Sequence, residues 1–195
     1  MFLFVGSNDF KKSAIILKLV SEWNKKSNYK MSRITIQKMC YFAEAVSVPL
    51  GYRFSVFKYG PYSQDLFDQI DDMIMYGLLS EENKDNGNKD NVSLFSTTDL
   101  ANDLLASYDD FLCLYDDKIN FLTNYFKDMS LRDLELFSTI HYYHTATNGY
   151  YNGLDKDELR ELTINYVINA VKDKFIKKEI SNAYFKMEEL PFAFC

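Results

Sequence analysis

Residues 52–63, YRFSVFKYGPYS, are the most informative part of the sequence for the fold. Residues 52–59 alternate loosely and are rich in aromatic and β-branched types, which is typical of a short strand. Gly60-Pro61 then predicts a turn, and Ser63 is a good N-cap for a helix that we expect over about residues 64–76. This stretch therefore predicts a short β element that leads directly into a helix.

The sequence on either side of this stretch predicts more helices and a β-hairpin. Apolar residues recur at helical spacing over residues 11–25 and again after Ser32, which predicts two helices. Gly77 ends the helix that follows Ser63, and residues 78–79 and 92–95 predict the strands of a hairpin with its tip at Asn86-Gly87. Thr97 or Thr98 caps the next helix. The order helix, helix, helix, hairpin, helix is that of a winged-helix module.

The second half of the sequence is helical throughout. We expect one helix over residues 111–126, a second that is capped by Ser130 and followed by a turn marked by Asn148-Gly149 and Asn152-Gly153, and a third that begins with the capping box of Asp155 and Glu158. The chain is therefore predicted to be mostly α. A winged-helix-like lobe over residues 1–108, with a small β-hairpin, is expected to pack on a helical lobe over residues 109–195.

Composition fits such a fold. Of the 195 residues, 47% are hydrophobic and 16% aromatic, with only seven Gly and three Pro, so the chain can build a core and has few helix breakers. No apolar run approaches the roughly 18–20 residues that span a bilayer. The three widely spaced cysteines, Cys40, Cys113 and Cys195, predict free thiols in a reducing compartment. We therefore expect a cytoplasmic protein with no membrane partner.

Charge is distributed unevenly along the chain. Residues 1–63 carry ten Lys and Arg against three Asp and Glu, whereas residues 64–195 carry twelve against twenty-five. Such asymmetry indicates two different faces or a chance unevenness of the surface. The helix expected after Ser63 and the residues just beyond it, 64–82, hold six acids and no Lys or Arg. This helix would repel a phosphate backbone, so readout of a DNA groove by it is not expected.

Two motifs resemble a known family. IQKMCYF (residues 36–42) followed by FKYGPYS (residues 57–63) resembles the Panacea (SocA-like) antitoxin domain and the related YwgA-like bacterial proteins, which show an LQKLxYxA helix and then a YGP turn. Val56 stands where Panacea members usually carry Trp, and Met39-Cys40 replace the usual Leu-Leu. The form of residues 59–63 and the stretch 134–143 are more similar to the YwgA-like branch.

This resemblance implies a helical, winged-helix-like fold. It also implies a toxin–antitoxin, prophage or defence context, and action by contact with another protein, as an antitoxin or an adaptor would act. The identity of that protein, the choice between antitoxin, adaptor and structural subunit, and the oligomeric state are left open by the sequence.

No assembled catalytic, cofactor or metal site is expected. The sequence has neither a Gly-rich phosphate loop nor a Gly-x-Ser-x-Gly nucleophile elbow. His141 and His144 lie three residues apart on a predicted helix, but a catalytic zinc ion needs three protein ligands and no further histidine exists. Both histidines follow the apolar line of Leu134 and Phe137, which favours buried, hydrogen-bonded side chains. We therefore predict a protein without enzymatic activity.

Two hypotheses for function remain. The first is a non-catalytic protein–protein interaction module, antitoxin-like or adaptor-like. Its candidate contact residues are Lys38, Lys58, Tyr59, Tyr62, Phe192 and Phe194. The alternative is a nucleic-acid-binding module that uses a basic N-terminal helical face. The candidate residues of that face are Lys11, Lys12, Lys25, Lys26, Lys30 and Arg33.

Overall fold

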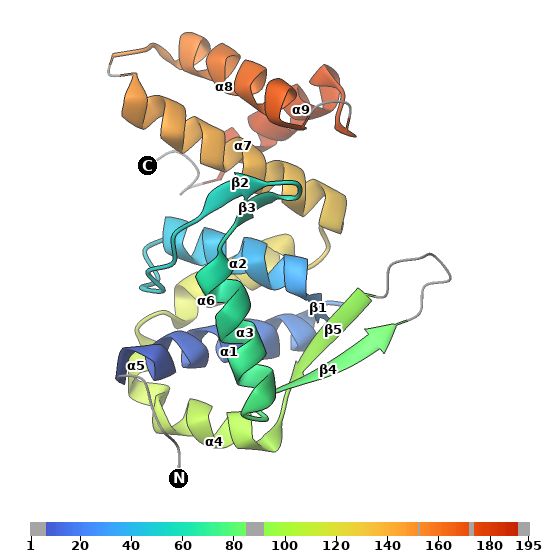
Figure 1. Cartoon of the computed structure of the whole chain (residues 1–195). Coiled ribbons are helices and arrows are strands. Elements are labelled where there is room, and N and C mark those ends of the chain that lie inside the picture. The colour runs from blue at the N-terminus through green and yellow to red at the C-terminus, as the bar shows by residue number, and fades with distance from the viewer. Residues whose placement is uncertain (1–6, 85–91, 152, 172–173, 191–195) are drawn as a thin grey trace. The chain divides into compact units, whose positions relative to one another are not determined.

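The computed structural model describes residues 7–84, 92–151, 153–171 and 174–190 (Figure 1). The chain divides into two compact units. Unit 1 comprises Met1–Arg53 and Ser63–Met129, and unit 2 comprises Phe54–Tyr62 and Ser130–Cys195. Both are mostly helical with a small antiparallel sheet, in agreement with the predicted fold class.

Unit 1 is built around a long buried helix, α1. Its helices are α1 (Ser7–Lys26), α2 (Arg33–Ala45), α3 (Gln64–Met75), α4 (Asp99–Ser107), α5 (Asp109–Cys113) and α6 (Asp116–Phe126). Residues 13–17 of α1 are all buried, and α2, α4, α5 and α6 all contact this helix. The stacked rings of Phe42 and Phe126, whose centroids lie 4.6 Å apart, join α2 to α6 within this core.

The predicted helix starts in unit 1 are confirmed by their caps. The Ser32 side chain accepts a hydrogen bond from the Thr35 amide at 3.2 Å, and the Ser63 side chain accepts one from Leu66 at 3.4 Å. Thr98, the second of the two predicted candidates, caps α4 by accepting from Ala101 at 3.3 Å. Each cap satisfies one backbone N–H at a helix start that has no partner inside the helix.

The sheet of unit 1 contains the predicted hairpin and one short strand. Its strands are β1 (Met31–Ser32), β4 (Leu79–Lys84) and β5 (Val92–Thr97), in the antiparallel order β1-β5-β4. Met31 pairs with Phe95 and Leu79 pairs with Thr97, and all four side chains except that of Thr97 are buried. The predicted tip at Asn86-Gly87 lies outside the described residues.

Unit 2 places a second hairpin on a long helix. Strands β2 (Ser55–Phe57) and β3 (Gly60–Tyr62) pair antiparallel, and β3 contacts α7 (Leu131–Tyr150). Helices α8 (Lys156–Val171) and α9 (Lys177–Glu188) contact each other and α7. Asp155 and Glu158 form the predicted capping box at the start of α8, with hydrogen bonds of 2.9 and 3.0 Å.

Two predicted helix boundaries are wrong. The helix expected over residues 111–126 is interrupted at 114–115 between α5 and α6. Helix α7 does not end at Asn148-Gly149 but continues to Tyr150, and the Tyr151 amide still donates to the Thr147 carbonyl at 2.9 Å. The chain turns after it, with Gly153 of the predicted Asn152-Gly153 at φ +98°. A glycine inside a helix costs about 1 kcal/mol, and a long packed helix tolerates that cost.

The division into units differs from the boundary that we expected at residue 108. Helices α5 and α6 contact α1, so the chain up to residue 129 clusters with unit 1. The β2–β3 hairpin contacts α7 and therefore clusters with unit 2, although it lies between α2 and α3 in the sequence. None of the helices in the described part of the chain is both long and apolar enough to cross a membrane.

Candidate functional site

The β2–β3 hairpin presents an exposed aromatic and basic surface within unit 2. We define the hairpin surface as Phe57, Lys58, Tyr59, Tyr62 and Lys174. Phe57 is 71% exposed and Tyr59 41% exposed, and the rings of Phe57 and Tyr62 lie 5.7 Å apart. The Tyr59 ring has two ammonium groups near its face, with Lys58 Nζ at 5.2 Å and Lys174 Nζ at 4.6 Å from the centroid.

A glycine holds this hairpin close to α7. Gly60 has φ +80°, a conformation that L side chains rarely adopt. A Cβ atom added there would overlap Thr139 Oγ1 and would lie 3.3 Å from the Glu135 carbonyl oxygen. Gly60 therefore allows both the turn of the backbone and its close approach to the helix.

An ion pair positions Lys174 at the hairpin surface. Lys174 Nζ donates to both carboxylate oxygens of Glu135, at 2.6 Å for Oε2, and Glu135 is buried. Arg132 supports the same segment, because its guanidinium donates to the Lys174 carbonyl at 2.9 Å and to Glu179 at 2.7 Å. The same guanidinium lies 4.2 Å from the centroid of the Phe175 ring. Lys174 is therefore fixed beside Tyr59 by contacts on α7 and α9.

These features suit the recognition of a partner. Exposed aromatic rings supply contact area with few rotatable bonds, and cations beside them favour an anionic or aromatic group on a partner. Tyrosine and other aromatic residues are enriched among the residues that carry binding energy at protein interfaces.

The predicted contact residues are only partly brought together. Lys58, Tyr59 and Tyr62 lie on the one hairpin. Lys38 lies on α2 with 1% of its surface exposed, so this lysine is not part of an exposed surface. Phe192 and Phe194 lie outside the described residues.

The predicted basic face is largely neutralised by neighbouring acids. Lys25 and Lys26 both pair with Glu22, at 3.0 and 3.3 Å, and Lys26 also donates to Asn120 at 2.6 Å. Burial favours the neutral form of Glu22, but the two lysines outweigh it and lower the pKa of this carboxyl group.

The other four residues of that face also have partners. Lys30 pairs with Glu82 at 2.9 Å, and Arg33 pairs with Asp71 at 2.7 Å. The ammonium groups of the remaining two lie over aromatic rings, Lys11 at 5.1 Å from the Phe111 centroid and Lys12 at 4.8 Å from that of Tyr52. Asp71 of α3 thus lies next to Arg33 at the start of α2, and Glu82 of β4 lies next to Lys30 just before β1, so the charge asymmetry of the sequence is reduced in space.

The two histidines are buried in unit 2, as predicted. His144 Nδ1 shares a hydrogen bond of 2.7 Å with the Tyr184 hydroxyl. Burial lowers the pKa of each imidazole to about 4, and the neighbouring His144 adds to the effect on His141. Among the residues that the structure describes, no three His, Cys, Asp or Glu side chains gather where they could hold a metal ion.

Two of the three cysteines lie in the described part of the chain, and both are free thiols. Cys40 is buried in α2 and Cys113 is exposed at the end of α5. Burial, together with the Glu44 carboxylate, raises the pKa of the Cys40 thiol. A thiol in this state is an inert packing group.

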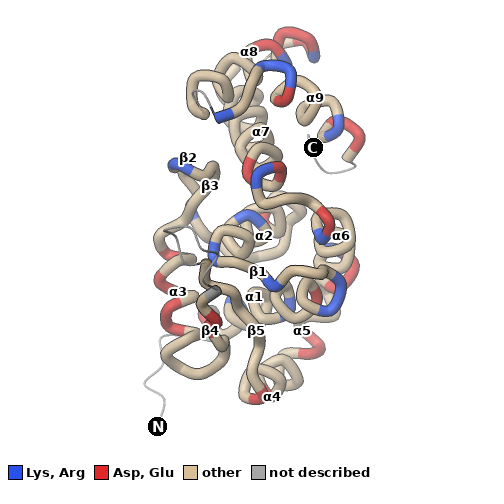
Figure 2. The backbone as a smooth tube through the Cα atoms, turned by 90° about the vertical axis from the view of Figure 1, so that its right-hand side faces the viewer, with Lys and Arg blue, Asp and Glu red and all other residues tan. Residues whose placement is uncertain are grey.

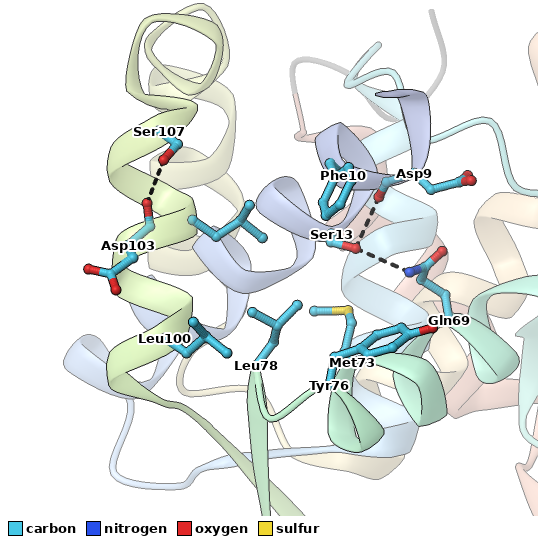
Figure 3. A pocket seen from close by; sticks show the side chains of 11 residues that line it. Asp9, Phe10, Ser13, Gln69, Met73, Tyr76, Leu78, Leu100, Asp103 and Ser107 are labelled. Atoms are coloured by element: carbon cyan, nitrogen blue, oxygen red, sulfur yellow. Dashed lines mark hydrogen bonds between the residues drawn. The ribbon is translucent and has the colours of Figure 1, made fainter. Parts of the chain in front are cut away.

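The structure also contains an apolar pocket that the sequence did not predict. It lies within unit 1 among α1, α3 and α4, and its volume is about 250 Å³ (Figure 3). The apolar part of its lining consists of Phe10, Met73, Tyr76, Leu78, Leu100 and Leu104. No pattern in the sequence distinguishes these residues, because those on α1, α3 and α4 recur at the same helical spacing as the core.

Hydrogen bonds fix the polar edge of this pocket. Ser13 Oγ donates to the Asp9 carbonyl at 3.0 Å and accepts from Gln69 Nε2 at 3.1 Å, which links α1 to α3. On α4, the Ser107 hydroxyl donates to the Asp103 carbonyl at 2.8 Å. Figure 3 shows Asp9 and Asp103 on opposite sides of the apolar residues.

Unit 2 also contains a tyrosine cluster that was not predicted from the sequence. The rings of Tyr143 and Tyr166 stack at 6.2 Å with an interplanar angle of 11°, and the hydroxyls of Tyr151 and Tyr166 share a hydrogen bond of 3.1 Å. Together with Tyr150 they line a cavity of about 390 Å³. The continuation of α7 past Gly149 brings Tyr150 to this cluster.

The described residues thus define a mostly helical protein with two small hairpins, one of which carries the hairpin surface. No family model matches the chain. The chain is similar to the uncharacterized protein YwgA of Bacillus subtilis (strain 168), with 29% identity over 183 residues. The match covers 92% of this chain and 96% of YwgA. This similarity supports the YwgA-like resemblance and does not extend to the Panacea antitoxin domain.

Proposed function

We propose that the protein is a non-catalytic protein–protein interaction module, which contacts its partner through the hairpin surface. The observation that carries the proposal is the pair of exposed rings, Phe57 and Tyr59, on a hairpin that Gly60 holds against α7. A rigid aromatic surface loses little conformational entropy when it binds. Lys58 beside Tyr59 favours a partner segment with acidic residues, whereas the charge of Lys174 is balanced by Glu135.

We further propose an antitoxin-like or adaptor-like role in a bacterial toxin–antitoxin, prophage or defence context. The support is the resemblance of residues 36–42 and 57–63 to the Panacea and YwgA-like motifs. The residues of the second motif form the hairpin and the cap of α3, so the motif coincides with the proposed contact surface.

A winged-helix-like architecture for unit 1 belongs to the same proposal. Its support is the element order α1-β1-α2-α3-β4-β5 with the sheet order β1-β5-β4. In such a module α3 would take the place of the helix that enters the major groove. Helix α3 carries four aspartates and no Lys or Arg, which favours a protein partner over nucleic acid (Figure 2).

Affinity purification from the native host tests the proposal. The tagged wild-type chain is compared with Phe57→Ser and with the matched control Met75→Ser, whose side chain on α3 is similarly exposed at 68%. Washing includes nuclease and high salt. We expect a stoichiometric protein partner with the wild type and the control, and its loss with Phe57→Ser.

Recovery of nucleic acid that washes off with salt, without a protein partner, would contradict the proposal and support the basic face instead. Equal recovery of the partner with both variants would show that the hairpin surface is not the contact.

A further inference from the structure

We propose that the apolar pocket of unit 1 is a second docking site, and that it takes the apolar face of a partner helix that carries Lys or Arg next to its apolar residues. The site lies in the other unit from the hairpin surface and does not depend on it. The argument rests on the lining, the volume and the charge of the pocket.

The lining is apolar and open to solvent. Leu100 remains 43% exposed and Leu104 is half-buried, although both lie in a helix whose other face packs on α1. Met73 and Leu78 continue the apolar floor from α3 toward β4. Exposed apolar area of this kind, rimmed by polar groups, is characteristic of interaction sites.

The volume fits side chains better than a drug-sized ligand. A cavity of about 150 Å³ holds one benzene molecule, so about 250 Å³ corresponds to one or two large apolar side chains. Small-molecule sites usually start at about 300 Å³. A groove among helices that takes one or two side chains matches the way an amphipathic helix inserts its anchor residues.

The charge around the pocket selects the partner. Asp9 and Asp103 lie at opposite edges of the pocket with their carboxylates turned outward from the apolar residues (Figure 3), and the lining contains no Lys or Arg. Two of its three helices are acidic, since α3 carries four aspartates and α4 carries two, and neither has a cation (Figure 2). An anionic lipid surface or a phosphate backbone would be repelled, whereas a helix with Lys or Arg at the edges of its apolar face would be attracted.

Fluorescence anisotropy on the full chain tests this inference with defined probes. The first probe is a labelled helical peptide with Leu at positions i, i+3, i+4 and i+7 and Lys at its other positions. The second has the same leucines with Glu in place of Lys. We expect the Lys peptide to bind with at least about tenfold higher affinity, because like charges at an interface oppose association.

Matched variants locate the binding. Leu100→Gln alters the lining, and its control is Leu114→Gln, an exposed leucine at the end of α5 outside the pocket. We expect Leu100→Gln to weaken binding of the Lys peptide about tenfold, because the bound peptide would bury the Leu100 side chain and this apolar contact is lost. Leu114→Gln should leave the affinity unchanged.

A second pair of variants tests the charge. Asp9→Asn with Asp103→Asn is compared with Asp117→Asn with Asp128→Asn, which removes the same net charge away from the pocket. Asp9 and Asp117 both lie in the first turn of a helix, so their contributions to the helix ends are matched. We expect about threefold weaker binding for the first pair at low salt and a smaller effect at high salt.

Three results would overturn the inference. The first is equal affinity for the Lys and Glu peptides, and the second is an equal effect of each pocket variant and its control. The third is a neutral apolar dye that occupies the pocket while neither peptide binds, which would make the pocket a small-molecule site. Phe57→Ser should bind the Lys peptide normally, so failure of this inference is distinct from failure of the hairpin surface.

Discussion

Replacing Gly60 with alanine tests how the hairpin surface is held against α7. Two effects oppose the new side chain, the backbone angle of φ +80° and the overlap of its Cβ with Thr139 Oγ1. Gly77, with φ +71° and nothing within 4 Å of the added atom, is a control that experiences the first effect without the second. The pair of variants therefore separates backbone strain from close approach.

The expected magnitudes follow from these two effects. A left-handed backbone costs an L-residue about 1–2 kcal/mol, so Gly77→Ala should lower the free energy of unfolding by about that amount. Crowding in a packed region adds about 1–3 kcal/mol, so Gly60→Ala should cost about 2–5 kcal/mol. Adding Thr139→Ala removes the overlapping oxygen and should recover part of the second contribution. Recovery is incomplete, because the Glu135 carbonyl oxygen would still lie 3.3 Å away.

Urea unfolding followed by circular dichroism gives these free energies, and hydrogen exchange locates them. For Gly60→Ala, faster exchange is expected in residues 55–62 and in α7, and not in unit 1. Equal losses for Gly60→Ala and Gly77→Ala, with no rescue by Thr139→Ala, would refute the close approach of the hairpin to α7.

Further predictions concern charge and reactivity. Both buried histidines have a pKa near 4 in the fold against an ordinary value of 6.5, so the unfolded chain binds protons first as the pH falls. The free energy of unfolding should fall by about 2 kcal/mol per histidine from pH 7 to pH 5. In urea titrations at the two pH values, His141→Gln should show a fall that is smaller by the contribution of one histidine. Native alkylation followed by peptide mass spectrometry should modify Cys113 and spare Cys40, and equal labelling would contradict the burial of Cys40. Lys174→Ala leaves the buried Glu135 without this partner and should cost about 1–3 kcal/mol, less when Glu135→Ala is added. A double-mutant cycle with no coupling would show that this ion pair does not form.

The predictions that succeeded rest on local signals. A serine or threonine cap acts on an amide three residues away, so Ser32, Ser63 and Thr98 are visible in any window of sequence. Gly77 has the left-handed conformation that its place after a helix predicts. The hairpin after it follows from apolar and turn residues in the same short segment.

The predictions that failed, or were not made, depend on contacts between distant segments. The sequence does not show that the basic face is paired with acids, because the partners lie far away in the chain. Asp71 of α3 comes 38 residues after Arg33, and Glu82 of β4 comes 52 residues after Lys30. The burial of Lys38 depends on what packs over α2, which a helical pattern does not specify. Helix α7 continues through Asn148-Gly149 because packing against α8 outweighs a weak local preference for a turn.

The hairpin surface was half predictable. Lys58, Tyr59 and Tyr62 lie within residues 52–63, so these three could be named from the sequence. Phe57 lies in the predicted strand, whose loose alternation does not say which side chains are exposed, and Lys174 lies 115 positions beyond Tyr59 in the chain. Its ion pair with Glu135 becomes visible once α7 and the segment between α8 and α9 are placed together.

Photo-crosslinking in the native host tests the central proposal most directly. A photoreactive amino acid is placed at position 57 on the hairpin, and at position 75 on α3 as a control with similar exposure. We predict a discrete protein adduct from position 57 that persists after nuclease and high salt, and none of that size from position 75. The absence of a protein adduct at position 57, or the same adducts at both positions, would contradict partner binding through the hairpin surface.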